Sequence, residues 1–360
     1  MKIILLYGGM SAEHDISIIS AHNILQSVMY DYYDVQPIYI TREGKWLRGG
    51  LLKSPTDFSD QLILESAQLE TWAEVEESFS TGVEISPGSI QEDDAIVFPV
   101  LHGPNGEDGT IQGFLEVLNM PYVGAGVTAS ACGMDKIISK HLFDEAEIPQ
   151  VPFVSFNQNM WRNHTEEWVQ KCEGSLIYPF YVKPANMGSS VGISRVENQE
   201  ELKVAVEEAL NYDSRILVEQ GIIATECEVA VLGNADPNVS VVGQLIKETD
   251  FYNYEEKYIN NRVEMKIPAD LPEEVTQKIQ DYALRAYRVL DGCGLSRVDF
   301  FVTQSQDVYI NEVNTMPGFT QFSMYPLLWE ATGLERRDLI EELLQLALKR
   351  HKAKQSLSHE

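Results

Sequence analysis

The sequence is poor in cysteine, and its four cysteines are scattered over 360 residues. Cys132, Cys172, Cys227 and Cys293 form no C-x-x-C pair and have no histidine at metal-ligand spacing. This pattern argues against a disulfide framework and a zinc site, and it indicates reduced thiols. No apolar run approaches membrane-spanning length, and the opening strand at residues 3–7 is too short for a secretion signal. We therefore expect a cytoplasmic protein without a membrane partner.

Positive charge is the second shortage. The chain has 27 lysines and arginines against 55 aspartates and glutamates, which gives a formal net charge of −28. Such a chain repels polyanions, so we expect no nucleic-acid partner. The charge still allows a nucleotide that is held locally by a metal ion and a few lysines. The length and the 44% apolar fraction predict two or three domains with buried sheets.

Two common nucleotide-binding motifs are also missing. Neither the P-loop G-x-x-x-x-G-K-[ST] nor the dinucleotide fingerprint G-x-G-x-x-G occurs. Nevertheless, the strand at residues 3–7 leads through two glycines to a helix that Asp15 could cap, as in a doubly wound α/β domain. A glycine-rich loop at residues 102–109 opens another helix near Thr110, where backbone N–H groups could meet an anion.

The rest of the chain alternates strands and helices. A helix is expected to open at residues 134–136, and Pro149 and Pro152 suggest a boundary. Residues 54–90 look acidic and irregular. Residues 248–266 have no hydrophobic period and predict a long loop, which in a compact domain is typically a lid or a binding loop. Further elements are expected at residues 180–183, 193–196, 198–211, 215–219, 228–232, 239–245 and 271–290, followed by two C-terminal helices.

A hairpin near the C-terminus carries the clearest chemistry. Residues 295–318 predict two strands around a turn at residues 304–307. If the hairpin closes symmetrically, Asp299 faces Glu312 and Arg297 faces Asn314. Two facing carboxylates repel unless a cation lies between them, and oxygen ligands suit Mg²⁺. An edge hairpin with a solvated acidic face is the alternative.

A glycine–serine loop at residues 186–192 could close over phosphates through its backbone N–H groups and serine hydroxyls. Lys183, just upstream on a strand, would add positive charge below it. Taken alone, the loop could equally be a hairpin turn, and Lys136 could be a solvated lysine.

Together these stretches resemble the D-alanine–D-alanine ligase family, in the right order and at the expected spacing. They are SAEH (residues 11–14), LHGPNGEDG (101–109), MDK (134–136), VKP (182–184) with GSSVG (188–192), and RVD (297–299) with NEVNTMPG (311–318). The resemblance implies an ATP-grasp fold (α/β, with α+β character in the ATP-binding half) and an N-terminal doubly wound α/β domain. It implies three units: an N-terminal domain at residues 1–125, a central subdomain with the glycine–serine loop at 126–220, and a C-terminal domain with the metal hairpin and lid loop at 221–360.

The resemblance also implies residues for ATP. The residues that would contact ATP are Lys136, Lys183 and Ser190 at the phosphates, Glu219 with the backbone of Gln220 and Ile222 at adenine, Glu226 at the ribose, and Lys257 at the γ-phosphate. The implied metal ligands are Asp299, Glu312 and Asn314, which would hold two Mg²⁺ ions, with Mn²⁺ able to replace them. Without the family, Glu226 would be interpreted as a surface glutamate on an edge strand.

For D-alanine, the resemblance implies the following set: Glu13 at the first ammonium with His102 near its carboxylate, Ser189 and Tyr258 linked to Glu13, Arg297 and the Gly318 N–H at the oxyanion, and Ser323 with Met324 at the second carboxylate. On their own, His102 could be a satisfied loop histidine and Ser323 a helix cap.

The implied reaction is ATP-dependent ligation of two D-alanines through an acyl phosphate, for peptidoglycan precursor synthesis, by a homodimer. Tyr258 favours D-alanine as acceptor, unless it only packs with Phe251, Tyr252 and Tyr254. The alternatives are a D-alanine–D-lactate or D-alanine–D-serine ligase, a different ATP-grasp enzyme, and a two-lobed binding protein without chemistry.

Overall fold

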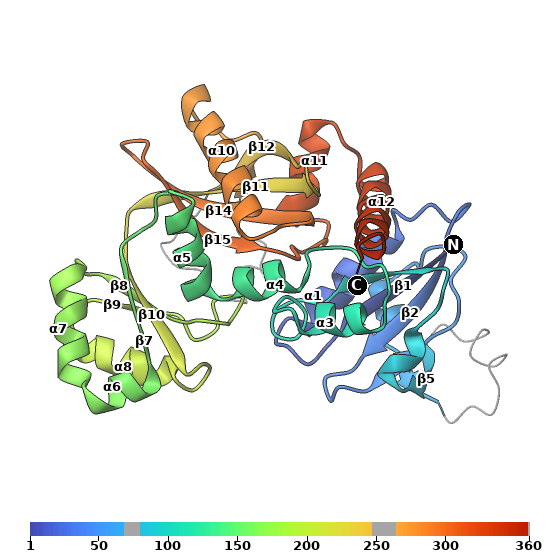
Figure 1. The fold of residues 1–360 in the computed structure, drawn as a ribbon, viewed down its shortest axis with the longest axis horizontal. Coiled ribbons are helices and arrows are strands. Elements are labelled where there is room, and N and C mark those ends of the chain that lie inside the picture. The colour runs from blue at the N-terminus through green and yellow to red at the C-terminus, as the bar shows by residue number, and fades with distance from the viewer. Residues whose placement is uncertain (68–79, 247–263, 359–360) are drawn as a thin grey trace.

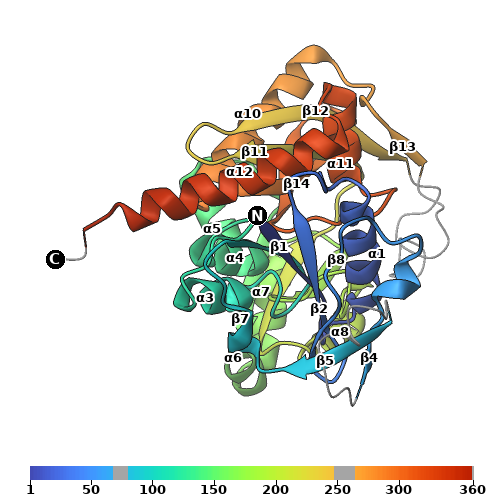
Figure 2. The same ribbon diagram turned by 90° about the vertical axis from the view of Figure 1, so that its right-hand side faces the viewer.

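The structure is a computed structural model that describes residues 1–67, 80–246 and 264–358. The described residues form three sheets, which Figures 1 and 2 show from two sides. Each sheet is built from a consecutive part of the chain. Mixed helices and sheets confirm the predicted α/β class.

The N-terminal sheet has the strand order β4-β5-β3-β2-β1-β6. Three strands at one end of the sheet are parallel, with β1 (Lys2–Gly8) between β2 (Asp34–Ile40) and the edge strand β6 (Ala95–Val100). The other strands are β3 (Trp46–Arg48), β5 (Thr81–Ile85) and β4 (Glu65–Ser66), and two short 3₁₀ turns occupy Ser59–Leu62 and Pro87–Ile90. Parts of the segment expected to be irregular at residues 54–90 are therefore ordered elements of this sheet.

Alternation along β1 explains why helices cover both faces of the N-terminal sheet. Leu5 and its odd-numbered neighbours pack into the cluster that contains α1 (His14–Leu25). Leu6 packs into the cluster on the other face, with α3 (Thr110–Val117). Successive side chains point to opposite faces, so one buried apolar strand serves two layers. The predicted doubly wound arrangement is confirmed. The helix cap is different: Glu13 precedes α1, while Asp15 lies inside it and pairs with Arg42.

The middle sheet is antiparallel in the order β7-β10-β8-β9. Its strands are β7 (Phe153–Asn157), β10 (Arg215–Gln220), β8 (Phe180–Pro184) and β9 (Ser194–Val196). Its helices are α6 (Gln158–Asn163), α7 (Thr165–Ser175) and α8 (Gln199–Ala209). The first two of these helices had not been predicted. Asn157, whose side chain caps α6 by accepting the Met160 N–H, was the sequence signal for α6.

The C-terminal sheet is antiparallel in the order β13-β12-β11-β14-β15. Its strands are β13 (Glu264–Lys266), β12 (Asn238–Ile246), β11 (Ala224–Gly233), β14 (Gly294–Thr303) and β15 (Val308–Asn314). The helices of this part are α10 (Glu273–Val289), α11 (Met324–Thr332) and α12 (Arg336–Gln355). The last three residues of the expected long loop thus form an edge strand, and residues 247–263 lie outside the described residues.

Two helices early in the chain pack on the C-terminal sheet. They are α4 (Val127–Met134) and α5 (Lys136–Glu145), and both contact β15. Ala129 and Phe143 are buried in the same cluster as Val298 on β14. The expected domain boundaries at residues 125/126 and 220/221 remain a prediction.

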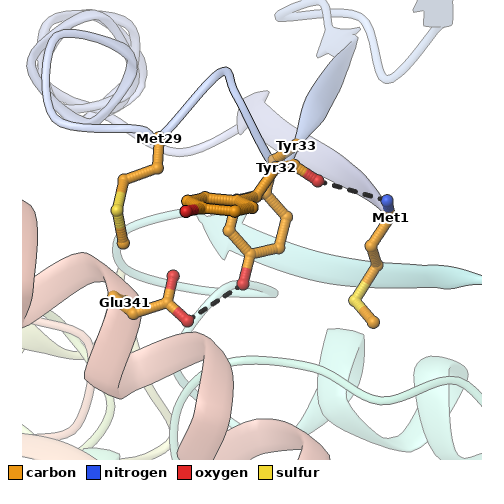
Figure 3. A pocket seen from close by; sticks show the side chains of 5 residues that line it. All are labelled: Met1, Met29, Tyr32, Tyr33 and Glu341. Carbon is orange, nitrogen blue, oxygen red and sulfur yellow. Dashed lines mark hydrogen bonds between the residues drawn. The ribbon is translucent and has the colours of Figure 1, made fainter.

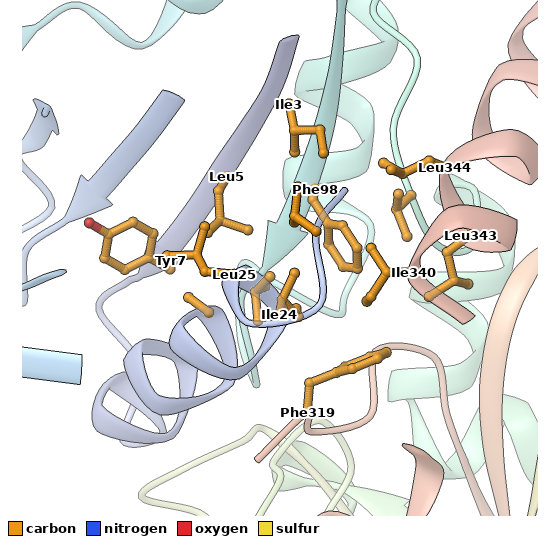
Figure 4. Packing of buried hydrophobic residues seen from close by; sticks show 14 of the residues in the cluster. Ile3, Leu5, Tyr7, Ile24, Leu25, Phe98, Phe319, Ile340, Leu343 and Leu344 are labelled. Atoms are coloured by element: carbon orange, nitrogen blue, oxygen red, sulfur yellow. The ribbon is translucent and has the colours of Figure 1, made fainter. Parts of the chain in front are cut away.

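The C-terminal helix α12 packs against both the first and the third sheet. It contacts β6 of the first sheet as well as β11 and β14 of the third. Figure 4 shows Ile340 and Leu343 of α12 on the same side as Phe98 of β6, and Leu5 of β1 belongs to the same cluster. The N-terminal and C-terminal parts therefore share one hydrophobic core. No helix in the described residues is long and apolar enough to cross a membrane.

Candidate active site

The hairpin of β14 and β15 places two carboxylates opposite each other. Asp299 pairs with Glu312, and Arg297 pairs with Asn314. Directly opposed residues share a face of a sheet, so all four side chains project from one side. The predicted register is confirmed.

The turn of this hairpin differs from the prediction by one residue. The Thr303 N–H donates to the Asp307 carbonyl at 3.0 Å, so the loop consists of residues 304–306, with Gln306 at a φ of 67°. That shorter loop would shift the pairing by one residue. A β-bulge between Asp299 and Phe300, where the register skips Asn311, shifts it back. Two deviations cancel, and the carboxylates still meet.

A third carboxylate, which the sequence analysis missed, lies beside these two. Glu228 on β11 is directly opposite Asp299. Arg297 donates from Nε and Nη2 to the two Asp299 oxygens at 2.8 and 2.7 Å, and its Nε lies 3.0 Å from Glu228 Oε2. One guanidinium thus neutralises part of a row of acidic groups. The sequence signal was a second glutamate two residues after Glu226, on the same strand face.

The oxygen atoms on this face fit a hard cation. Asn314 Oδ1 is buried and has no hydrogen-bond partner in the described part of the chain. An orphaned buried acceptor beside two facing carboxylates fits the role of a metal ligand. The candidate ligands are the carboxylates of Asp299 and Glu312 and the amide oxygen of Asn314. Among the described residues, no cluster of three or more His, Cys, Asp or Glu side chains could hold a metal.

The N-terminus of α5 brings Lys136 to the same place. Asp135 caps this helix by accepting the Ile137 and Ile138 N–H groups at 3.0 Å, and Arg215 holds its other oxygen. Lys136 Nζ donates to the Met187 carbonyl at 2.7 Å and lies 3.8 Å from Glu312 Oε2. The Lys136 ammonium group therefore lies between the glycine–serine loop and the acidic hairpin.

Two further lysines meet at Glu219. Lys183 Nζ is 2.5 Å from Glu219 Oε2, and Lys140 Nζ is 2.6 Å from Glu219 Oε1. Burial opposes ionisation of Glu219, but the two lysines outweigh it and lower the pKa of the carboxyl group to about 2. Burial likewise opposes protonation of Lys183, yet the Glu219 carboxylate raises its pKa above the ordinary value. Lys140, on α5, had no sequence signal beyond its spacing of four from Lys136.

The glycine–serine loop reaches across to the first sheet. Ser189 and Ser190 both adopt left-handed backbone conformations, with φ of 50° and 61°. Ser189 Oγ donates to Glu13 Oε1 at 2.5 Å. Left-handed serines are uncommon and cluster at functional loops. This bond joins residues 176 positions apart, and it links the loop between β8 and β9 of the middle sheet to the start of α1 beside the first sheet.

The glycine-rich loop after β6 surrounds Glu13 with buried groups. Gly103 has a φ of 71°, and a Cβ there would lie 2.9 Å from Glu13 Oε2. The Gly103 N–H donates to Glu107 Oε2 at 2.6 Å. Burial, followed by the Glu13 charge, raises the pKa of Glu107 to about 8. His102 is buried between the Met316 carbonyl (3.0 Å) and Ser20 Oγ (3.4 Å), and burial lowers its pKa.

The segment after β15 lies close to this loop. The Phe319 N–H donates to Ser20 Oγ of α1 at 3.1 Å. A Cβ on Gly318 would lie 2.9 Å from Ser323 Oγ, so glycine permits this close approach. Ser323 accepts the Thr320 N–H at 2.9 Å, and Met324 begins α11 as a buried residue.

The residues expected around adenine lie at the end of β10 and on β11. Gln220 ends β10, its N–H donates to the Pro152 carbonyl at 3.0 Å, and its side chain accepts the Ile177 N–H at the same distance. Ile222 follows in the connection to β11, and Glu226 pairs with Phe301 of β14. The predicted Lys257 and Tyr258 lie outside the described residues.

Comparison with known families covers both halves of the chain. The model of the D-Ala D-Ala ligase N-terminus matches residues 2–125, and that of the D-Ala D-Ala ligase C-terminus matches residues 142–345. The chain belongs to the D-alanine–D-alanine ligase family. As a member of it, the protein is an ATP-dependent ligase, and the expected family, ATP-grasp fold and ligase activity are confirmed.

Relatives of this ligase family match the chain along nearly its whole length. The D-alanine–D-alanine ligase of Enterococcus faecalis is 58% identical over 98% of this chain and 100% of its own length. That of Enterococcus hirae is 56% identical over 99% and 98%. Among solved structures, a D-alanine–D-alanine ligase from Coxiella burnetii has a TM-score of 0.78 at 34% identity, covering 99% of this chain and 96% of its own. The VanG D-Ala:D-Ser ligase from Enterococcus faecalis reaches 0.81 at 33%, covering 96% and 99%.

A cavity of about 210 Å³ lies where the ligase loops converge. It is lined by residues of three loops: Met10 to Glu13, Pro104 and Asn105, and Met187, Gly188, Ser189 and Val191. A larger hollow of about 340 Å³ lies elsewhere, between the chain start and α12, lined by Met1, Met29, Tyr32, Tyr33 and Glu341 (Figure 3). Tyr33 donates to Glu341 there at 3.0 Å. None of the residues that line this larger hollow is a predicted site residue, whereas Glu13 and Ser189 line the smaller cavity. The smaller cavity therefore belongs to the candidate active site.

Proposed function

We propose that the enzyme joins two D-alanine molecules through an acyl phosphate and releases D-alanyl-D-alanine, ADP and phosphate for peptidoglycan precursor synthesis. The observation that carries the proposal is the Ser189–Glu13 hydrogen bond. It ties a loop suited to phosphates to a carboxylate suited to an ammonium group. The hairpin that carries Arg297 supplies a hydrogen-bond donor for the oxyanion and the oxygen ligands for the metal ion at the same site.

In the first step, a carboxylate oxygen of the first D-alanine attacks the γ-phosphorus, and the bond to the β-phosphate oxygen breaks. Glu13 binds the ammonium of this D-alanine, and His102, kept neutral by its burial, lies near the carboxylate. Lys136, Lys183 and the Ser190 loop hold the phosphates. Such transfers depend mainly on positioning and on neutralisation of charge.

In the second step, the amine nitrogen of the second D-alanine attacks the acyl carbon after losing a proton. The carbonyl oxygen becomes an oxyanion, and collapse of the tetrahedral intermediate expels phosphate. Arg297 and the Gly318 N–H donate to the oxyanion, a role typically worth a hundredfold or more in rate. Ser323 and the N-terminus of α11 at Met324 hold the carboxylate of the second D-alanine.

The hairpin residues Asp299, Glu312 and Asn314 would hold Mg²⁺, as two ions, with Mn²⁺ able to take their place. When bound, the metal would neutralise the phosphate oxygens of ATP. Glu219 and the backbone at Gln220 and Ile222 would bind adenine, Glu226 the ribose, and Lys257 the γ-phosphate. We also propose a homodimer in the cytoplasm, which light scattering and cell fractionation would test.

The acceptor is proposed to be D-alanine, with D-serine as the second candidate because one structural relative is a D-Ala:D-Ser ligase. The proposal rests on Tyr258. A tyrosine hydroxyl can join the Ser189–Glu13 pair and stays neutral up to about pH 10, whereas a protonated histidine would attract D-lactate and repel the ammonium form of D-alanine.

The test is phosphate release from ATP with mass spectrometry of the products, at pH 6 and pH 8, for D-alanine alone and in mixtures with D-serine or D-lactate. We expect mainly D-alanyl-D-alanine, and Tyr258→His should shift the product toward D-alanyl-D-lactate at pH 6. Tyr32→His, at an exposed tyrosine remote from the site, is the matched control. Mainly D-alanyl-D-lactate or D-alanyl-D-serine from the wild type would overturn the acceptor assignment.

A further inference from the structure

Lys140 is an almost fully buried lysine that the reaction scheme above does not use. Its side chain is 3% exposed, and the Glu219 side chain that it contacts is 4% exposed. It lies one turn after Lys136 on α5, over the Phe153 ring at 5.2 Å from the ring centre. Burying a lysine is costly, and such residues are retained where a paired charge is needed.

The helix α5 meets the middle sheet at this point. Ile137 of α5 packs with Ala185 and Leu217 in a small buried cluster. Lys183 pairs with Leu217 across β8 and β10, two positions from Glu219. The three charged groups are therefore held by three different elements. Packing therefore fixes the backbone positions of the three groups, and only a side-chain movement can separate Lys183 from Glu219.

The charges of this group do not cancel. Each oxygen of Glu219 takes one lysine, at 2.6 Å for Lys140 and 2.5 Å for Lys183, so one carboxylate faces two ammonium groups. If Lys183 leaves, Lys140 and Glu219 remain as a neutral buried pair. If Lys140 were absent, the departure of Lys183 would leave a buried carboxylate without a counter-ion, which is strongly unfavourable.

We propose that Lys140 is a positioning residue for the nucleotide: it stays on Glu219 so that Lys183 can move to the phosphates of ATP. This inference rests on the proposed function, because it assumes that Lys183 binds phosphate and Glu219 adenine. The Glu219 oxygen that Lys183 vacates is then free to accept from the exocyclic amine of adenine. Lys140 thereby couples recognition of the base to recognition of the phosphates.

The first test is Lys140→Met, measured as the affinity for Mg-ADP by calorimetry and as the KM values for ATP and D-alanine. We expect the ADP dissociation constant and the KM for ATP to rise roughly 10- to 100-fold, since Glu219 would retain Lys183. The KM for D-alanine should stay within about threefold. Lys140→Arg, which keeps the charge, should restore most of the ADP affinity.

A double variant separates positioning from packing. In Lys140→Met/Glu219→Gln there is no carboxylate to retain Lys183, so ADP should bind more tightly than to Lys140→Met alone. A purely structural lysine would give no such rescue. Lys203→Met is the matched control, because Lys203 makes an ion pair of the same 2.6 Å length with Glu166 at the surface of α8.

The outcomes are distinct. Wild-type ADP affinity in Lys140→Met, or an equal loss in the single and double variants, would overturn the inference while the ligase function stands. A wild type that binds Mg-ADP but makes no dipeptide would overturn the proposed function instead. Rescue of ADP binding in the double variant, with the KM for D-alanine unchanged, supports the positioning role.

Discussion

A protonated carboxyl group close to the ammonium-binding position is an unusual feature at the scale of single residues. Burial and the neighbouring Glu13 raise the pKa of Glu107 from 4.5 to about 8. The native state therefore holds a proton that the unfolded chain loses above about pH 4.5. The stabilisation is complete below that pH and is lost as the pH rises to about 8.

Glu107→Gln should remove this pH dependence. The amide oxygen can still accept the Gly103 N–H, but it has no proton to lose. We expect the free energy of unfolding of the variant to fall less between pH 5 and pH 8 than that of the wild type, by roughly 2 kcal/mol or more, since one pKa unit corresponds to about 1.4 kcal/mol. Urea unfolding at pH 5, 6.5 and 8 measures it. Glu208→Gln, at an exposed glutamate of α8, is the control, and parallel curves for Glu107→Gln and wild type would contradict the account.

Arg297 should not be replaceable by lysine, although the charge is the same. Its guanidinium donates to both oxygens of Asp299 and lies against Glu228, a geometry that a single ammonium cannot reproduce. We expect Arg297→Lys to lower kcat by about a hundredfold, as removal of an oxyanion donor typically does. Steady-state kinetics at saturating D-alanine measure the change. A variant that keeps most of the wild-type kcat would show that the two hydrogen bonds from one planar guanidinium are not required.

At the scale of elements, the hairpin of β14 and β15 carries the metal assignment. Asp299→Ala and Glu312→Gln should each leave the fold intact and lower turnover about a hundredfold or more, because each removes one oxygen ligand. Mn²⁺ binding in the presence of ADP, followed by electron paramagnetic resonance, should weaken in parallel. Asp307→Asn, at an exposed residue next to the turn of the same hairpin, should change neither. Near-normal activity of either site variant at limiting Mg²⁺ would contradict the metal assignment.

The hairpin also shows how far the sequence predicts structure. Alternation and an assumed four-residue turn placed Asp299 opposite Glu312, and the structure has this pair although the turn is shorter. The bulge at Asn311 could not be predicted, because it compensates for a loop whose αL residue, Gln306, is not a glycine or an asparagine. The right register followed from two errors that cancel.

Residues that act through tertiary contacts had little or no signal of their own. Lys140 looks like any lysine on a helix, and only the packing of α5 against β10 places it on Glu219. Glu228 could have been found from its spacing of two from Glu226. The motif residues were accessible from the sequence because their spacing along the chain resembles a family, and geometry alone would not have given their roles.

At the scale of the whole molecule, α12 links the first and third sheets through one core (Figure 4). Leu343 is fully buried in it, so Leu343→Ala should lower the free energy of unfolding by about 2–5 kcal/mol through lost burial and a cavity. Urea unfolding followed by fluorescence and circular dichroism measures the loss. Leu357→Ala, at an exposed leucine near the chain end, should change stability by less than about 0.5 kcal/mol. A loss below about 1 kcal/mol in Leu343→Ala would contradict a shared core.

The most direct measurement follows the oxygen atoms of the reaction. In the proposed chemistry, a carboxylate oxygen of the first D-alanine becomes bonded to the γ-phosphorus and leaves with phosphate. With D-alanine labelled by ¹⁸O in both carboxylate oxygens, each phosphate released should therefore carry one ¹⁸O atom, and each dipeptide should retain three. Mass spectrometry of the phosphate and the dipeptide decides the matter. Unlabelled phosphate accompanied by dipeptide would contradict the acyl-phosphate route, and labelled phosphate in equal number to the dipeptide is the predicted result.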